Sequence, residues 1–267
     1  MKPANSILAS YGTTIFEVMS RMAQEHGAIN LGQGFPDGNG PPDVVAVAKD
    51  YLKNGLNQYP SMMGIPALRE AVADINKRFY GLTVDSRSEV MVTSGGTEAL
   101  AASLFALIEP GDEVVLIEPL YDSYLPIVKR AGGVAKLVRL EPPNWELSEE
   151  LLAKVFSNKT KLILLNSPMN PCSKVFSKNE LSVIAHLLEK FDAYAICDEV
   201  YEHLVFDGLE HIPLMTLPGM RERCVRIGSA GKTFSLTGWK VGYITASPNL
   251  LAPISKAHQF LTFTTPP

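Results

Sequence analysis

The sequence predicts an α/β protein built on a mostly parallel sheet that is sandwiched by helices. Short apolar runs of strand length alternate along the chain with segments of helical periodicity, which favours parallel strands joined by crossover helices. Apolar residues make up 46% of the 267 residues and charged residues 19%, as is ordinary for a globular chain with a sizeable core. We therefore expect one large domain preceded by a smaller amino-terminal piece.

The amino-terminal piece, residues 1–42, is expected to form an arm or part of a small domain. A helix is predicted over residues 14–25, and residues 31–42 that follow are rich in Gly and Pro. The large domain is expected over residues 43–267. Its first predicted helix covers residues 67–79, where apolar side chains recur at helical spacing.

The rest of the large domain alternates strands and helices. Helices are predicted over residues 97–108 and 178–190 among others. Ligands on open sheets of this kind bind beyond the carboxyl ends of the strands, so polar residues there are the first site candidates. The strand candidates are residues 89–93, 113–117, 135–140, 161–165, 194–197, 224–227 and 241–245.

Charge and composition exclude several classes of partner. The chain has 24 basic and 28 acidic residues, which gives a net charge of -4. It therefore has no excess of positive charge that would attract nucleic acid or an anionic membrane. No apolar run reaches membrane-span length and no secretory leader is visible, so a cytoplasmic location is expected. The 3 cysteines are far apart, which predicts reduced thiols and no metal site.

Lys232 is the residue that points most directly to a chemistry. It lies in a run, residues 227–243, of small, apolar and hydroxyl side chains without an acid. A lysine that is poorly solvated as a cation becomes a neutral nucleophile toward an aldehyde. Ser229 precedes it by three residues and Lys240 follows it by eight, and a hydroxyl and an ammonium together suit a phosphate dianion.

A second anion-binding candidate follows the predicted strand 89–93. Gly95 and Gly96 allow close approach of the backbone, and Thr97 opens the predicted helix, whose first N–H groups carry partial positive charge. The alternative is an ordinary strand-to-helix turn in which Thr97 caps the helix. The pattern is not the dinucleotide-binding glycine motif, so it gains weight only together with Lys232.

Four further candidates stand just beyond predicted strands. Asp198 can pair with a protonated ring nitrogen, and Tyr201 and Asn170 can bond a ring oxygen. Tyr121 can stack on such a ring. Each also has a structural interpretation, since Asp and Asn-Pro are common in turns and a tyrosine is common in a core.

Taken in their order along the chain, the segments around Gly95, Tyr121, Asn170, Asp198 and Lys232 resemble those of the fold-type I aminotransferases of class I and II, which depend on pyridoxal 5'-phosphate (PLP). The run from Ser229 to Phe234 is similar to that of the kynurenine aminotransferase and glutamine transaminase K group. The resemblance implies a Schiff base between Lys232 and PLP. It also implies that Asp198, with Tyr201, acts on the cofactor ring and that Ser229, Lys240 and residues 95–97 bind its phosphate.

The resemblance extends to the amino-terminal half of the chain. Tyr59 resembles the tyrosine that family members extend to the phosphate of the neighbouring subunit, which implies a homodimer with shared active sites. Gly34 lies in a loop that resembles the substrate side of the kynurenine and glutamine transaminase group, and Phe16 falls at a pocket aromatic. Asn170 is a further candidate for the substrate carboxylate. Buried packing is the alternative for Phe16.

The function implied is transfer of an amino group from an aromatic, sulfur-containing or glutamine-type amino acid to a 2-oxo acid. Family members continue beyond Pro267 and use an arginine that this chain lacks in the matching region, so a truncated protein is expected. A non-catalytic PLP-fold module and a PLP-dependent β-lyase acting on cysteine conjugates are the alternatives. A P-loop nucleotidase is disfavoured because Arg226 stands where that motif requires Gly.

Overall fold

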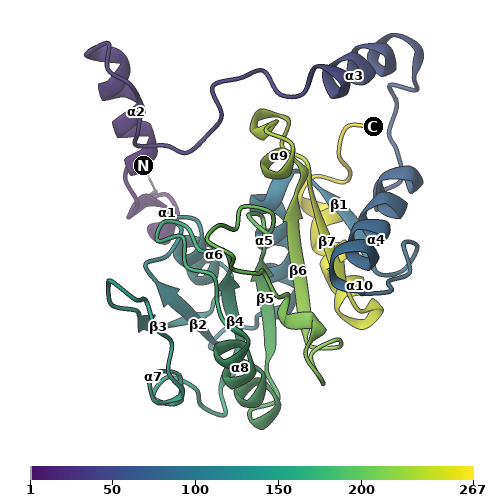
Figure 1. Cartoon of the computed structure of the whole chain (residues 1–267). Helices are drawn as coiled ribbons and strands as arrows, with labels where there is room; N and C mark the ends of the chain where they lie inside the picture. The colour runs from purple at the N-terminus through teal and green to yellow at the C-terminus, as the bar shows by residue number, and fades with distance from the viewer. Residues whose placement is uncertain (1) are drawn as a thin grey trace.

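The computed structural model describes residues 2–267, and the strands of this part of the chain form one seven-stranded sheet (Figure 1). Along the sheet their order is β1-β7-β6-β5-β4-β2-β3. Each predicted strand is confirmed to within one or two residues. The bounds are β1 Val90–Thr93, β2 Glu113–Glu118, β3 Val134–Arg139, β4 Thr160–Asn166, β5 Tyr194–Asp198, β6 Cys224–Ser229 and β7 Gly242–Ala246.

The sheet is mostly parallel, as predicted. Strands β3, β2, β4, β5 and β6 pair in parallel, whereas β7 runs antiparallel to both of its neighbours, β6 and β1. Because only β7 is reversed, its amino end lies at the same edge of the sheet as the carboxyl ends of the other strands. This edge is called the C-edge below.

Helices cover both faces of the sheet. Two of the long helices end or begin at clear local signals: Ser177 and Glu180 form a capping box at the start of α8, and Gly81 ends α4 with a φ of 67°. The bounds are α1 Ser6–Ala9, α2 Ile15–Glu25, α3 Pro42–Asn54, α4 Pro66–Tyr80, α5 Gly95–Leu107, α6 Tyr124–Arg130, α7 Glu149–Ala153, α8 Lys178–Lys190, α9 Ala230–Thr233 and α10 Pro248–Leu261, with short 3₁₀ turns at Leu214–Thr216 and Thr237–Trp239.

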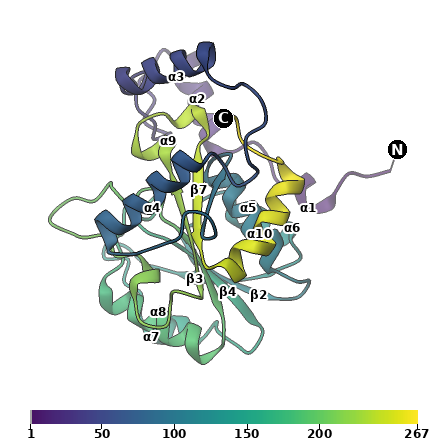
Figure 2. The ribbon, with the colours of Figure 1, turned by 90° about the vertical axis from the view of Figure 1, so that its right-hand side faces the viewer.

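Two large hydrophobic cores lie on opposite faces of the sheet, and a smaller cluster contains Val72, Val90 and Tyr243. Along β2, Val115 and Ile117 face the core beneath α7 and α8, whereas Val114 and Leu116 face the core beneath α5, α6 and α10. Alternate residues of one strand thus enter different cores, which explains why the strands read as continuous apolar runs. Figure 2 shows α10 and α5 together on one face and α7 and α8 on the other.

The start of α5 corrects one prediction. The helix was expected from Thr97, but it begins at Gly95, with Ser94 at the N-cap position. Thr97 therefore lies within the first turn and does not cap the helix. Gly95 has a φ of 76°, a left-handed conformation that favours glycine, so the chain turns directly from β1 into the helix.

The amino-terminal segment lies outside the two cores. Helices α1, α2 and α3 bury no residue completely, α1 lies against α6, and a long segment links α2 to α3 above the sheet (Figure 1). The division at residues 42 and 43 stays a prediction. None of the helices within residues 2–267 combines the length and the apolar run needed to cross a bilayer.

Candidate active site

The C-edge brings together the ends of four strands. Asn166 at the end of β4 pairs with Asp198 at the end of β5, and Ser229 at the end of β6 pairs with Gly242 at the start of β7. Between Ser229 and Gly242 the chain forms α9 and a 3₁₀ turn, so Lys232 and Lys240 both belong to this connection. The reversed strand β7 therefore places two lysines at the edge where parallel strands end.

Lys232 is half-buried at this edge. Its backbone N–H donates a 3.3 Å hydrogen bond to Ser229 Oγ, and its Nζ lies 5.4 Å from the ring centroid of Tyr201. Burial lowers the pKa of Lys232, while the nearby carboxylate of Asp198 opposes this shift. The amine is thus easier to deprotonate than an exposed lysine, as a nucleophile requires.

Asp198 is buried, and its environment holds it in a fixed position. The hydroxyl of Tyr124 donates a 2.6 Å hydrogen bond to Asp198 Oδ2, and the Asn166 amide donates a 2.8 Å bond to the Asp198 carbonyl oxygen. Burial raises the pKa of Asp198 to about 6, against the opposing effects of the Tyr124 bond and of Lys232. The carboxylate is therefore poised to gain stability from a cationic partner.

Tyr201 and Asn170 meet next to Lys232. The Asn170 side-chain amide donates a 3.4 Å hydrogen bond to the Tyr201 hydroxyl, and the Asn170 backbone N–H donates a 2.7 Å bond to Asn166 Oδ1. The polar groups of Asn170, which follows β4, and of Tyr201, which follows β5, thus lie next to each other. They are able to bond a single oxygen atom between them.

Tyr121 belongs to an aromatic group above this edge. Its ring lies edge-on to Tyr124, with centroids 5.6 Å apart, and 6.3 Å from the ring of Phe16 in α2. Burial raises the pKa of Tyr121. Phe16 is partly buried, so the structure brings an aromatic from the amino-terminal segment toward the site.

Gly95 and Gly96 at the start of α5 lie against the other side of the connection. A Cβ on Gly95 would come 3.2 Å from Lys240 Cε and 3.5 Å from its Nζ, so the end of the Lys240 side chain lies directly against this glycine. A Cβ on Gly242 would come 2.6 Å from the Gly95 carbonyl carbon. The amino end of a helix and a lysine side chain are therefore adjacent, and together they can hold an anion.

Two of the predicted site residues lie apart from this group. Gly34 is exposed in the segment between α2 and α3, and a Cβ built there would meet no atom within 4 Å. Tyr59 is 82% exposed and makes an edge contact with Phe263, at a centroid distance of 5.6 Å. Their roles toward the substrate and a neighbouring subunit stay predictions.

The sequence alone did not reveal the side chains that support the site. One is Tyr124, and another group surrounds Arg226, which is 5% exposed. Arg226 Nε lies 2.6 Å from Glu199 Oε2 and its Nη2 lies 2.8 Å from Glu202 Oε2. Tyr80 and Tyr243 donate hydrogen bonds of 2.7 and 3.1 Å to Glu202. A charged residue inside the predicted apolar strand 224–227 was the available signal, because a buried arginine requires buried acids.

The arrangement fits PLP. The fit rests on the half-buried amine of Lys232, on the buried carboxylate of Asp198, whose pKa is raised, and on the glycine start of α5, which lies against Lys240. Lys232 supplies a nucleophile, Asp198 a partner for a protonated pyridine, and the start of α5 with Lys240 a binding site for a phosphate. These groups come from the ends of separate strands. Among residues 2–267 no group of three or more His, Cys, Asp and Glu is arranged to hold a metal ion.

Comparison with known proteins gives a consistent result. The family model described as aminotransferase class I and II matches residues 26–266. The methionine aminotransferase of Escherichia coli K12 is 43% identical over 97% of this chain and 67% of its own length. The human kynurenine–oxoglutarate transaminase 1 is 42% identical over 92% of this chain and 61% of its own length.

Solved structures of such enzymes share the fold. The Escherichia coli protein YbdL, identified as a methionine aminotransferase, superposes with a TM-score of 0.96 at 41% identity over 100% of this chain and 70% of that one. The N-succinyldiaminopimelate aminotransferase of Mycobacterium tuberculosis superposes with a TM-score of 0.95 at 44% identity over 98% and 69%. The chain thus spans about two thirds of the length of the relatives it matches.

Proposed function

Because this chain belongs to the class I and II aminotransferases, a family of transaminases, we propose that residues 2–267 carry the cofactor-binding part of a PLP-dependent transaminase. The reaction is transfer of an amino group from an amino acid to a 2-oxo acid. The observation that carries the proposal is the half-buried position of Lys232: its Nζ lies 5.4 Å from the ring centroid of Tyr201, and burial lowers its pKa. Residues 43–267 are proposed as the large domain and residues 1–42 as a separate segment.

Lys232 is proposed to hold the cofactor aldehyde and to move the substrate Cα proton through its Nζ. When bound, PLP supplies an electron sink that makes the Cα–H bond of an attached amino acid acidic. Neutral Nζ is required both for attack on a carbonyl and for accepting a proton, and burial favours that neutral form. Asp198 holds the pyridine nitrogen protonated, since ionised Asp198 gains a cationic partner in its buried position.

The remaining contacts are proposed to orient the cofactor. Tyr201 and Asn170 bond its phenolic oxygen, because their polar groups already converge. Tyr121 stacks against the ring. The phosphate is held by Ser229, Lys240 and the N–H groups of residues 95–97, and by Tyr59 of a second copy in a homodimer.

Gly34, Phe16 and Asn170 are proposed for the substrate side. The curated relatives are described as acting on methionine, kynurenine and N-succinyldiaminopimelate, so an amino acid with a sulfur-containing, aromatic or glutamine-type side chain is the proposed substrate class. A cytoplasmic location also remains part of this proposal.

The proposal is tested by reduction of the protein after addition of PLP. We expect a visible absorption band that borohydride abolishes, with the pyridoxyl group mapped by peptide analysis to Lys232. Lys232→Ala should lose the adduct, and Lys256→Ala, which changes a lysine of α10, should retain it. An adduct on another lysine, or none, would contradict the cofactor assignment.

A half-reaction separates transamination from the alternatives. The loaded protein is mixed with methionine, glutamine or kynurenine, and formation of the 2-oxo acid is followed together with loss of the aldehyde band. Release of ammonia and pyruvate from a cysteine conjugate would indicate β-elimination instead. A correctly placed adduct without either product would mean that this part of the protein binds the cofactor but does not turn over.

A further inference from the structure

Glu98 places a carboxylate where the proposed function requires positive charge. It belongs to the first turn of α5, directly after Thr97, and its Oε2 accepts a 3.1 Å hydrogen bond from the Ser94 N–H. Its side chain is 9% exposed, so water screens its charge poorly. An uncompensated carboxylate here would oppose the binding of a phosphate by the same helix end.

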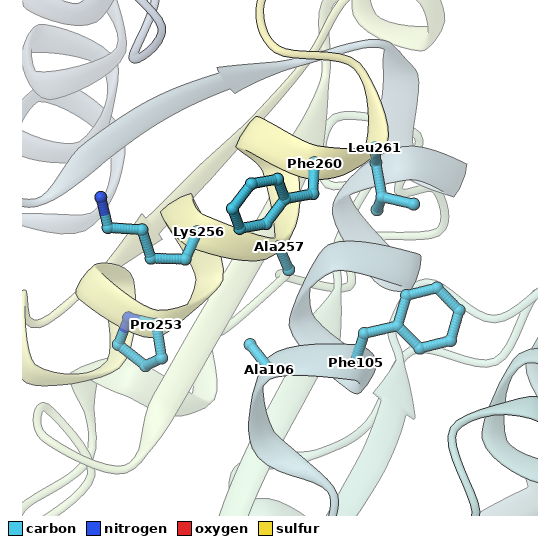
Figure 3. Close-up of a pocket in the computed structure, with 7 residues that line it drawn as sticks. All are labelled: Phe105, Ala106, Pro253, Lys256, Ala257, Phe260 and Leu261. Atoms are coloured by element: carbon cyan, nitrogen blue, oxygen red, sulfur yellow. The ribbon is translucent and has the colours of Figure 1, made fainter.

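His258 of α10 lies against this carboxylate. Figure 3 shows α10 alongside α5. The His258 side chain, which belongs to α10, is 0% exposed. Its Nδ1 lies 3.1 Å from Glu98 Oε1, and its Nε2 lies 3.0 Å from the carbonyl oxygen of Met62. Both ring nitrogens therefore face acceptors, with the adjustable hydroxyl of Thr262 at 3.4 Å from Nδ1.

The hydrogen-bond partners favour a His258–Glu98 pair that holds one additional proton. A carbonyl oxygen and an ionised carboxylate only accept hydrogen bonds, so both contacts form when the ring carries a hydrogen on each nitrogen. The other solution puts the hydrogen on Glu98 Oε1, which then donates to Nδ1. Either solution contains one additional proton, and in both the His258–Glu98 pair has no net charge.

The second nitrogen of His258 reaches the segment that follows Tyr59. Met62 lies in a loop that is also fastened by a 3.0 Å bond from the Val92 N–H to the Met63 carbonyl and by a 3.2 Å bond from Thr264 to the Ser61 carbonyl. One imidazole thus connects α10, the first turn of α5 and the loop after Tyr59.

We propose that His258 is a positioning residue for phosphate recognition: it neutralises Glu98 and so leaves the amino end of α5 free to bind a dianion. The inference rests on the proposed function, because it requires a phosphorylated ligand at α5. The mechanism gives His258 no contact with the cofactor or the substrate. Its effect is electrostatic and acts through Glu98.

The test compares the binding of PLP with that of pyridoxal, which lacks the phosphate, by titration of the visible band. In His258→Gln, the Glu98 carboxylate stays charged without a cationic partner, so PLP should bind about tenfold more weakly while pyridoxal changes by less than about twofold. In the double variant Glu98→Gln/His258→Gln no charge remains, and PLP affinity should return to within about threefold of the wild type. His186→Gln, on the exposed side of α8, is the matched control.

The outcomes separate this inference from the proposed function. Equal weakening of PLP and pyridoxal, or no recovery in the double variant, would overturn the electrostatic role of His258. If His258→Gln does not fold, Glu98→Gln alone is used; it should bind PLP at least as tightly as the wild type, and a tenfold loss refutes the inference. A wild-type protein that does not prefer PLP over pyridoxal would instead refute the proposed phosphate site itself, and the inference with it.

Discussion

The hydroxyl of Tyr124, at the first residue of α6, lies 2.6 Å from Oδ2 of Asp198, at the last residue of β5. The two residues are 74 positions apart in the chain. Tyr124 is fully buried beside the carboxylate, and burial raises its own pKa well above the usual range. Tyr124 is therefore protonated at neutral pH and donates this hydrogen bond to the Asp198 carboxylate.

Replacing Asp198 should stabilise the cofactor-free protein at high pH. The pKa of Asp198 is about 6 in the folded state and 3.8 when unperturbed, so the folded state binds the proton more tightly. Stability then falls as pH rises from about 4 to about 6 and stays lower above that range. Asp198→Asn should raise the free energy of unfolding at pH 8 by up to about 3 kcal/mol, and by little at pH 4.

Urea denaturation of cofactor-free protein at the two pH values measures this effect. Asp207→Asn is the control, because Asp207 is exposed and has a φ of 57° that asparagine also adopts. Equal changes at pH 8 and pH 4 would show that the Asp198 carboxylate is not strained by burial.

Tyr124→Phe should destabilise the protein by about 1–3 kcal/mol at pH 8. The variant removes the 2.6 Å bond and leaves a buried carboxylate with one donor fewer, so the pKa of Asp198 should rise further. The loss should be smaller at pH 4, where Asp198 is largely protonated. Tyr51→Phe, which changes an exposed tyrosine of α3, is the control. A loss of stability in Tyr124→Phe that does not depend on pH would indicate an effect of packing alone.

Arg226→Met should cost about 3–5 kcal/mol, because it leaves Glu202 buried without its cationic partner and Glu199 with only His211, whose Nε2 lies 3.1 Å from Glu199 Oε2. Arg226 is the main favourable charge that holds the pKa of Glu199 below its ordinary value. A depressed acid pKa contributes stability that is lost as pH falls, so the cost of the substitution should shrink toward pH 4.

Arg223→Met tests whether burial causes this cost. Arg223 forms an ion pair with Asp192, whose side chain is 90% exposed, and such pairs contribute about 0–1 kcal/mol. Thermal unfolding of both variants at pH 8 distinguishes the two positions. Similar losses for Arg223→Met and Arg226→Met would mean that the buried network contributes no more than a surface pair.

Gly228→Ala should destabilise the protein by about 1–3 kcal/mol. A Cβ at this position of β6 would overlap the ring of Tyr243, which lies across it and donates to Glu202. Gly238→Ala is the matched control, because a Cβ there would meet no atom within 4 Å. Equal melting temperatures for the two variants would contradict close packing of Tyr243 on Gly228.

The strands were predictable because most of them are buried on both faces. Val114 to Ile117 alternate between two cores, so the run is apolar throughout and its ends are sharp. The start of α5 was misplaced because a glycine with positive φ turns the chain earlier than the first good N-cap residue suggests. Helix α8 was predicted from its first to its last residue by its apolar spacing, and a capping box marks the same start in the structure.

The sequence predicted which side chains lie together in the site only where those side chains stand at the ends of strands. Lys232, Asp198 and Asn170 follow strands that end at one edge, so the topology alone brings them together. Tyr124 and His258 act through helices, and their contacts depend on how each helix is rotated against the sheet. Neither rotation is encoded in a local pattern, and for that reason both residues were missed.

The pairing of β1 with β7 also determines when the protein is able to fold during its synthesis. Val90 is hydrogen-bonded in register with Thr245, so β1 emerges from the ribosome long before its partner exists. At ordinary rates of translation the interval is roughly 10–30 s. During that time an apolar strand has no neighbour on the nascent chain, and a chaperone that shields it should raise the yield of folded protein.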